Sequence, residues 1–317
     1  MNLIFNTTHL PEQIKVSKAS ILSEMDLEAV LSNDRERKGI RGELFASKFK
    51  EFYGFQLSKG RGAIENYEFF IKQLIDGDVP CLFFLPQESL PVRKDTKGIA
   101  TKFASLKTDK DIVNFAKEYG LLGVLAPSYK TTDYGVTVFE PLYFWKFYIK
   151  EVKKVLKLYK MLEKKHRNQD IEIIGELIEY KENKEDSSSI FEWKDGGKIP
   201  FFHDEEELDD YENYDQVVGV NIFTTLVRNG LRNAINVDFT NIVEAKDSRM
   251  GFRIKEVYST NYLLGAIYYD LWQLINKDVE IKFCEHCGRP FKKFGKKRFC
   301  GTSCRVMSWT EDQEEDN

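Results

Sequence analysis

Four of the five cysteines of this 317-residue chain lie within 21 residues near its C-terminal end. They are Cys284, Cys287, Cys300 and Cys304, with two residues inside the first pair, twelve between the pairs and three inside the second pair. Thiolates at this spacing suit tetrahedral coordination of one Zn2+, with metal–sulfur distances of about 2.3 Å. Because four cysteines fill every position of a tetrahedral ion, no position remains for a reacting water. We therefore expect a single structural Zn2+.

The residues around the cysteines are those that a small zinc finger needs. Gly288 directly follows the second cysteine, where a tight Cys-x-x-Cys turn requires a residue that tolerates positive φ. Arg289 to Phe299 contains three phenylalanines among basic residues, which predicts a short hairpin over a minimal core. Gly301 to Ser303 are typical of a helix start, so Cys304 should lie in the first turn of a helix that runs toward Trp309. Together these features predict a treble-clef-like finger.

Disulfide bonds and unrelated cysteines are the alternatives to zinc. Met1 to Asn6 is not typical of a signal peptide, so we expect a reducing compartment, where a disulfide framework is disfavoured. Cys81 stands alone in an apolar run, which indicates a buried core residue. His286 lies between the first two cysteines and could replace one of them, although a position outside the ligand set is favoured.

The finger segment is strongly basic. From Lys282 to Arg305 the chain has eight Lys or Arg residues and one acid, Glu285, which gives +7. The −2 of a four-thiolate zinc centre would leave +5, in a chain whose net charge is −4. Such a surface can neutralise phosphates, although lysines also keep a small finger in solution. The candidate nucleic-acid contacts are Arg289, Lys292, Lys293, Lys296, Lys297, Arg298 and Arg305.

Length and composition indicate how the rest of the chain is organised. A chain of 317 residues predicts about two domains, and 42% hydrophobic with 14% aromatic residues can fill globular cores. No apolar run approaches the roughly 18 residues of a membrane span. We therefore expect a cytoplasmic protein of bacterial type that makes no membrane contact.

The fold class predicted from these patterns is α+β, predominantly α-helical. The clearest helix has a capping box at Thr108 and Asp111 and stops at Gly120. Pro80 to Pro86 is the best strand candidate, and its continuous apolar character indicates burial on both faces. Other helices are expected at Ser23 to Leu31, Arg41 to Tyr53, Pro141 to Arg167, Asp170 to Tyr180, Val217 to Ile235 and Asn261 to Ile275.

These elements suggest four regions. Residues 1–98 would form an N-terminal α+β region of unknown role, 99–280 a helical domain, 281–310 the finger and 311–317 an acidic tail. The helical domain contains an acidic insertion at about 181–215, with thirteen acids and four bases, which predicts a mobile loop or hairpin.

Three charged segments have functional and solvated interpretations. Pro141 to Arg167 has nine Lys or Arg and two Glu, so it could track a phosphate backbone, although a solvated face is the commoner outcome. His203 to Glu207 could bind a metal, but a run without a spaced partner favours solvated charge. Glu311 to Asp316 contains five acids that could fold back over the basic surface or form a disordered end.

Several motifs resemble a bacterial family. They are FAKEYGLLG at Phe115 to Gly123, EPLYFWK at Glu140 to Lys146, NYLLGAIYYDLW at Asn261 to Trp272, and the terminal CEHCGRPF and FCGTSCR segments. This combination is similar to the ABATE and CGNR zinc-finger proteins, a family thought to regulate transcription under stress. The resemblance covers about residues 100 to 310 and implies that the four cysteines bind zinc and that the protein binds nucleic acid. In this chain Cys304 is followed by Arg305-Val306-Met307, whereas the tetrapeptide that gives the CGNR family its name continues with Gly-Asn-Arg.

We therefore expect a nucleic-acid-binding, regulator-like protein, with DNA favoured as the partner. The alternative is a protein-interaction module with the finger as a docking platform, and a homodimer is compatible with either function. An enzyme is disfavoured because no nucleophile elbow, His-Glu-x-x-His helix or Walker-type loop is present.

Overall fold

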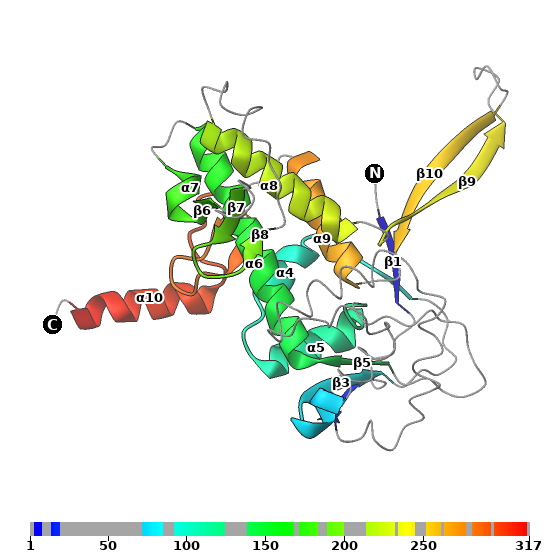
Figure 1. Cartoon of the computed structure of the whole chain (residues 1–317), viewed down its shortest axis with the longest axis horizontal. Helices are drawn as coiled ribbons and strands as arrows, with labels where there is room; N and C mark the ends of the chain where they lie inside the picture. Colours follow the sequence, from blue (N-terminus) through cyan, green and yellow to red (C-terminus); the bar gives the residue numbers. More distant parts are fainter. Residues whose placement is uncertain are drawn as a thin grey trace. The chain divides into compact units, whose positions relative to one another are not determined.

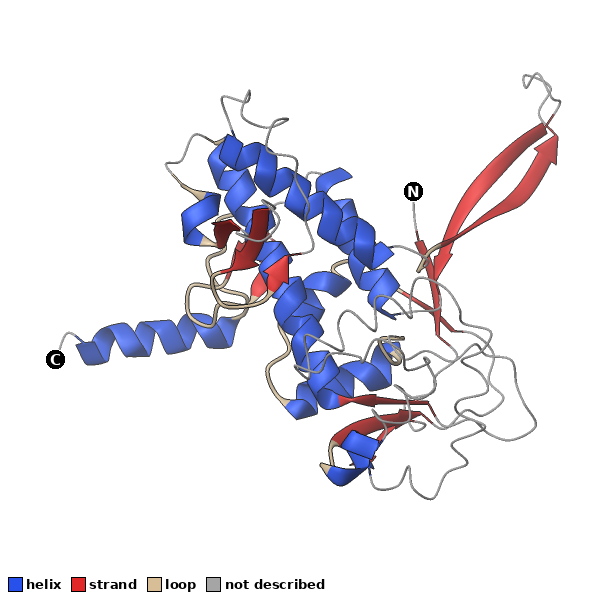
Figure 2. Ribbon diagram, viewed as in Figure 1, coloured by secondary structure: helices blue, strands red, loops and turns tan. Residues whose placement is uncertain are grey.

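The computed structural model combines α-helices with small, mostly antiparallel sheets (Figures 1 and 2). It describes residues 3–7, 14–19, 72–84, 92–123, 138–167, 171–182, 189–199, 214–231, 234–244, 252–260, 263–276, 281–292 and 295–315. The chain divides into two compact units, each built from separate stretches of sequence. Unit 1 comprises 1–97, 106–148 and 231–267, and unit 2 comprises 98–105, 149–230 and 268–317.

A four-stranded sheet in unit 1 has the order β4-β1-β10-β9. Strand β1 (Leu3–Thr7) lies parallel to β10 (Phe252–Thr260) and antiparallel to β4 (Val92–Lys94). Strand β9 (Asn236–Glu244) forms a long antiparallel pair with β10, which appears as the yellow and orange ribbon in Figure 1. Sequence reasoning predicted neither β9 nor β10.

A second sheet in unit 1 confirms the strand predicted at Pro80. Strand β3 (Pro80–Phe84) lies between β2 (Ile14–Lys18) and β5 (Val138–Pro141), antiparallel to both. Its consecutive residues Cys81, Leu82 and Phe83 are all buried. Because successive strand residues point to opposite faces, both faces of β3 are covered.

Helix α5 (Asp109–Tyr119) follows its predicted signals closely. The Asp111 backbone N–H donates to the Thr108 hydroxyl oxygen at 3.1 Å, and the Asp111 carboxylate accepts from the Thr108 N–H at 2.9 Å. This reciprocal pair is the predicted capping box. The helix ends at Gly120, which has a φ of 89°.

A buried carboxylate organises the start of the long helix α6 (Leu142–His166). Glu140 is 1% exposed and accepts hydrogen bonds from the backbone N–H groups of Leu122 and Gly123 at 2.9 and 2.8 Å. It also accepts from Trp145 Nε1 at 3.0 Å. Three donors satisfy a carboxylate that would otherwise be costly to bury.

The core of unit 2 is helical. Most of α6 and α9 (Leu263–Asn276), with α8 (Tyr214–Leu231) and α4 (Ile99–Ala104), supply its apolar side chains. The predicted helices 141–167, 217–235 and 261–275 are confirmed, with ends displaced by a few residues. Tight packing is visible at Gly219, where an added Cβ would lie 3.0 Å from Ile173 and 3.1 Å from Leu162.

The helix predicted at Asp170 to Tyr180 is wrong. Only the short turn α7 (Ile173–Glu176) forms, and Ile174 with a ψ of 122° and Gly175 with a φ of 105° are non-helical inside it. The Asp215 carboxylate accepts from the backbone N–H groups of Ile173 and Ile174 at 3.0 and 2.7 Å. A side chain distant in sequence thus satisfies the donors that a regular helix start would leave open.

The acidic segment begins as a sheet. Strands β6 (Ile178–Glu182), β7 (Ser189–Trp193) and β8 (Lys198–Ile199) form an antiparallel meander, which agrees with the predicted hairpin. Residues 183–188 and 200–213, which include His203 to Glu207, lie outside the described residues. The helices predicted at 23–31 and 41–53 also lie outside them.

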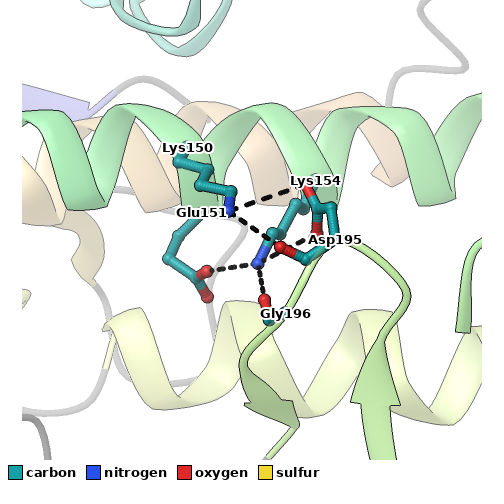
Figure 3. Close-up of polar contacts among 5 residues, drawn as sticks. All are labelled: Lys150, Glu151, Lys154, Asp195 and Gly196. Carbon is teal, nitrogen blue, oxygen red and sulfur yellow. Dashed lines mark hydrogen bonds and ion pairs between the residues drawn. The ribbon is translucent and has the colours of Figure 1, made fainter. Parts of the chain in front are cut away.

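Many basic residues of α6 pair with acids. Of the nine Lys and Arg residues in the predicted range Pro141 to Arg167, six form ion pairs, which are Lys146, Lys150, Lys154, Lys160, Lys165 and, just beyond the helix, Arg167. Figure 3 shows the most buried case, in which Lys154 lies between Glu151 and the turn at Asp195 and Gly196. Lys154, Lys160 and Lys165 are largely buried in these ion pairs, whereas Lys146, Lys150 and Arg167 stay more than half exposed, and we assign no nucleic-acid contacts to this face.

Among the residues that the structure describes, no helix is both long enough and apolar enough to cross a membrane.

Candidate metal centre

The four C-terminal cysteines converge on one point. Their Sγ atoms all lie within 4.8 Å of one another, and the Cys287–Cys300 and Cys300–Cys304 Sγ pairs are 3.6 and 3.5 Å apart. Tetrahedral sulfur ligands at about 2.3 Å from zinc would be about 3.8 Å apart. Two of the observed sulfur separations are close to that value. The four-cysteine group could therefore hold a metal ion.

A hairpin positions the first cysteine pair. Strands β11 (Ile281–Phe283) and β12 (Pro290–Lys292) pair antiparallel, with Cys284 at the end of β11. The Cys284 N–H donates to the Arg289 carbonyl at 2.9 Å, and the Gly288 N–H donates to the Cys284 carbonyl at 2.8 Å. Gly288 has the predicted positive φ, at 67°. This tight turn brings Cys284 and Cys287 together.

A helix start positions the second pair. Helix α10 (Thr302–Glu315) begins where Gly301 to Ser303 predicted, and Cys304 lies in its first turn. Cys300 immediately precedes the turn, and the Arg305 N–H donates to the Gly301 carbonyl at 3.3 Å. Helical geometry therefore brings the Cys304 thiol back toward Cys300 and the first pair.

Glu285 and Arg298 join the two halves of the centre. The Glu285 backbone N–H donates to the Arg298 carbonyl at 3.3 Å, and Arg298 Nε donates to the Glu285 carboxylate at 2.6 Å. The guanidinium of Arg298 also forms an ion pair with that carboxylate. This guanidinium lowers the pKa of Glu285. Sequence reasoning assigned Arg298 to nucleic acid and missed this contact, although Glu285 is the one acid among eight bases.

The thiols differ in how readily they ionise. Burial opposes ionisation of Cys284, but hydrogen bonds from the backbone N–H groups of Cys287 and Cys300 outweigh it and lower its pKa to about 6. Burial, followed by hydrogen bonds with the neighbouring thiols, raises the pKa of Cys300 to about 12. Crowded thiols suppress one another's ionisation, and a bound cation would remove that repulsion.

The predicted basic residues surround the centre at its surface. Arg289, Lys296, Lys297 and Arg305 are exposed, as is Arg298 beside Glu285. The Lys297 ammonium lies 5.9 Å from the centre of the Phe291 ring. Lys292 is the last residue of β12, its side chain is outside the described set, and Lys293 is outside it entirely.

The acidic end of the chain continues α10. Residues 302–315 are helical, so Glu311 and Glu315 lie seven and eleven residues beyond Cys304 in one helix. At about 1.5 Å per residue, they are displaced along the helix axis by roughly 10 and 16 Å. Folding these acids back over their own finger, as considered from the sequence, would require the helix to break.

Cys81 is separate from this centre. It is fully buried in β3, and its thiol lies 3.5 Å from the Val79 carbonyl oxygen. Burial raises its pKa to about 12. The structure thus confirms the predicted division between one core cysteine and four clustered cysteines.

Comparisons with protein-family models, with curated proteins and with solved structures found no match to this chain.

Proposed function

We propose that residues 281–310 form a treble-clef-like zinc finger that binds nucleic acid, with DNA favoured, and that gives the protein a regulator-like role. The observation that carries the proposal is the convergence of four thiols within 4.8 Å, surrounded by exposed cationic side chains. Cys284, Cys287, Cys300 and Cys304 would hold one Zn2+, whose role is to join the hairpin to the helix start. A four-cysteine site is closed, which favours a structural metal.

The surface charge supports a polyanionic partner. Lys296 and Lys297 lie on the loop between the hairpin and Cys300, and Arg289 and Arg305 flank the two cysteine pairs. A metal site fixes the backbone that carries all four residues, so little ordering would be needed when phosphates bind. Arg298 is assigned instead to the Glu285 contact, where it positions the two halves of the finger.

Fluorescence anisotropy of the zinc-loaded full chain with labelled duplex DNA, single-stranded DNA and RNA tests this proposal. We expect salt-sensitive binding that Lys296→Glu/Lys297→Glu weakens at least about tenfold. Loss of two phosphate contacts should lower the slope of log affinity against log salt by about 1.8 on duplex DNA. Lys110→Glu/Lys157→Glu is the matched control, because it makes the same charge change at exposed positions on α5 and α6.

The zinc content of each variant is measured alongside. Equal affinity losses in the finger variant and the control would show that net charge, and not the finger, governs binding. Binding to none of the three nucleic acids, by a protein that retains zinc, would overturn the proposal. The second candidate is then the protein-docking platform, which the half-exposed apolar residues Val306 and Met307 on α10 favour.

A further inference from the structure

The β11–β12 hairpin of the finger has two different faces. Strand pairing places Lys282 directly opposite Phe291, and Phe283 opposite Pro290. Because directly opposed residues share a face and successive residues alternate, Lys282 and Phe291 lie on one face. Ile281 and Pro290 lie on the other face and are buried, and β12 lies against helix α4 of the same unit. The face that carries Lys282 and Phe291 is therefore the outward one.

Phe291 is a half-buried aromatic ring among cations. Its neighbour across the hairpin is Lys282, and the Lys297 ammonium lies 5.9 Å from the centre of the ring. Arg289, two residues earlier in the chain, is exposed. Aromatic rings within a basic surface are typical of proteins that bind single strands, because bases stack on the rings while cations neutralise the phosphates.

We propose that the ligand of the finger is single-stranded nucleic acid, with an unpaired base stacked on Phe291 and the adjoining phosphates bound by Lys282, Lys297 and Arg289. This inference rests on the proposed function and narrows it to one class of nucleic acid. It also adds Lys282, which the sequence analysis did not include among the candidate contacts.

The geometry favours a single strand over a duplex. In a duplex the flat faces of the bases are stacked on one another, so a ring on the outward face of a hairpin meets only backbone and base edges. A single strand can turn one base onto the ring while its phosphates stay beside the lysines. A cation near a solvent-accessible ring is held weakly, so the Lys297 ammonium can move from the ring to a phosphate when the base arrives.

Fluorescence anisotropy of the zinc-loaded full chain tests this inference. The probes are labelled oligothymidylate and oligouridylate of about 12 nucleotides and a DNA duplex of the same length. Phe291→Leu keeps an apolar side chain and removes the aromatic face. It should weaken binding of both single strands at least about fivefold and change duplex binding less than about twofold. Phe283→Leu is the matched control, because it makes the same change on the other face of the hairpin.

Two further variants separate stacking from charge and from folding. Phe291→Trp keeps an aromatic platform, so single strands should still bind and should quench the added indole, whereas the duplex should not. The unsubstituted chain gives the background from its four native tryptophans. Lys282→Gln should lower the slope of log affinity against log salt by about 0.7 on single strands. The zinc content of each variant shows whether the finger remains folded.

The possible results distinguish this inference from the proposed function. If Phe291→Leu weakens duplex and single-strand binding equally, or if single strands leave the Phe291→Trp indole unquenched, stacking on Phe291 is wrong while nucleic-acid binding by the finger still stands. Binding to none of the three probes would overturn both. Unequal affinity for oligothymidylate and oligouridylate would show which sugar the site accepts, and dependence on Phe291 in either case supports the stacking site.

Discussion

Lys154→Met should be among the most destabilising single changes in unit 2. The Lys154 side chain is 4% exposed, and its ammonium lies 3.1 Å from Glu151 Oε1 and 3.3 Å from Asp195 Oδ1. It donates to the Gly196 carbonyl at 2.6 Å and lies 5.5 Å from the centre of the Trp193 ring. Methionine keeps most of the apolar stem and removes the charge and its contacts.

The magnitude follows from what the substitution leaves behind. The Glu151 side chain is 11% exposed, so the substitution would leave its carboxylate buried without the Lys154 ammonium beside it. Breaking a buried ion pair from one side costs about 3–5 kcal/mol, mostly because one charge stays buried. Lys150→Met is the matched control, because Lys150 also contacts Asp195 but is 54% exposed. An exposed pair contributes about 0–1 kcal/mol.

Urea unfolding followed by tryptophan fluorescence measures both variants, since Trp193 lies beside Lys154. The double variant Glu151→Leu/Lys154→Met removes both buried charges and should recover much of the loss. The coupling between residues 151 and 154 should therefore exceed about 1 kcal/mol. If Lys150→Met and Lys154→Met agree within about 0.5 kcal/mol, burial does not control the strength of this contact, and the reasoning fails.

Three further outcomes are expected. After chelation of the metal, the four clustered thiols should react with a thiol reagent, whereas Cys81 should stay unreactive because it is fully buried in β3, out of reach of the reagent. Zinc should protect those four, which a thiol count before and after loading checks. Cys304→Ser should lower the zinc affinity measured by competition with a chelator. The decrease should exceed the roughly 10- to 100-fold loss of metal affinity that follows removal of a residue hydrogen-bonded to a metal ligand. Asp270→Ala should lower the free energy of unfolding, measured in urea, by about 2 kcal/mol. The reason is that the Asp270 carboxylate accepts from the Gly98 and Ala100 N–H groups at 3.1 and 3.0 Å. An unchanged free energy of unfolding would mean that water replaces the carboxylate.

Features with local causes could be predicted from the sequence. The capping box at Thr108 and the positive φ at Gly288 each depend on residues within a few positions, and both are present. The cysteine cluster was predictable for a related reason. Its pairs are close in sequence, and the hairpin and helix start that join them have their own turn and capping residues. The buried strand at Pro80 was evident because burial on both faces removes polar residues from every position.

Features that depend on distant partners could not be predicted. The pairing of Leu3 with Tyr258 joins residues far apart in the sequence, and no local pattern encodes it. The failed helix at 170–180 illustrates the same limit, since Asp215 supplies the acceptors that favour a turn there. The same limit applies to the lysines of α6, for which the sequence predicted only a solvated or a phosphate-binding face because their acidic partners are distant in sequence. Whether Lys154 is paired depends on Asp195 and Gly196, which only the fold brings beside it.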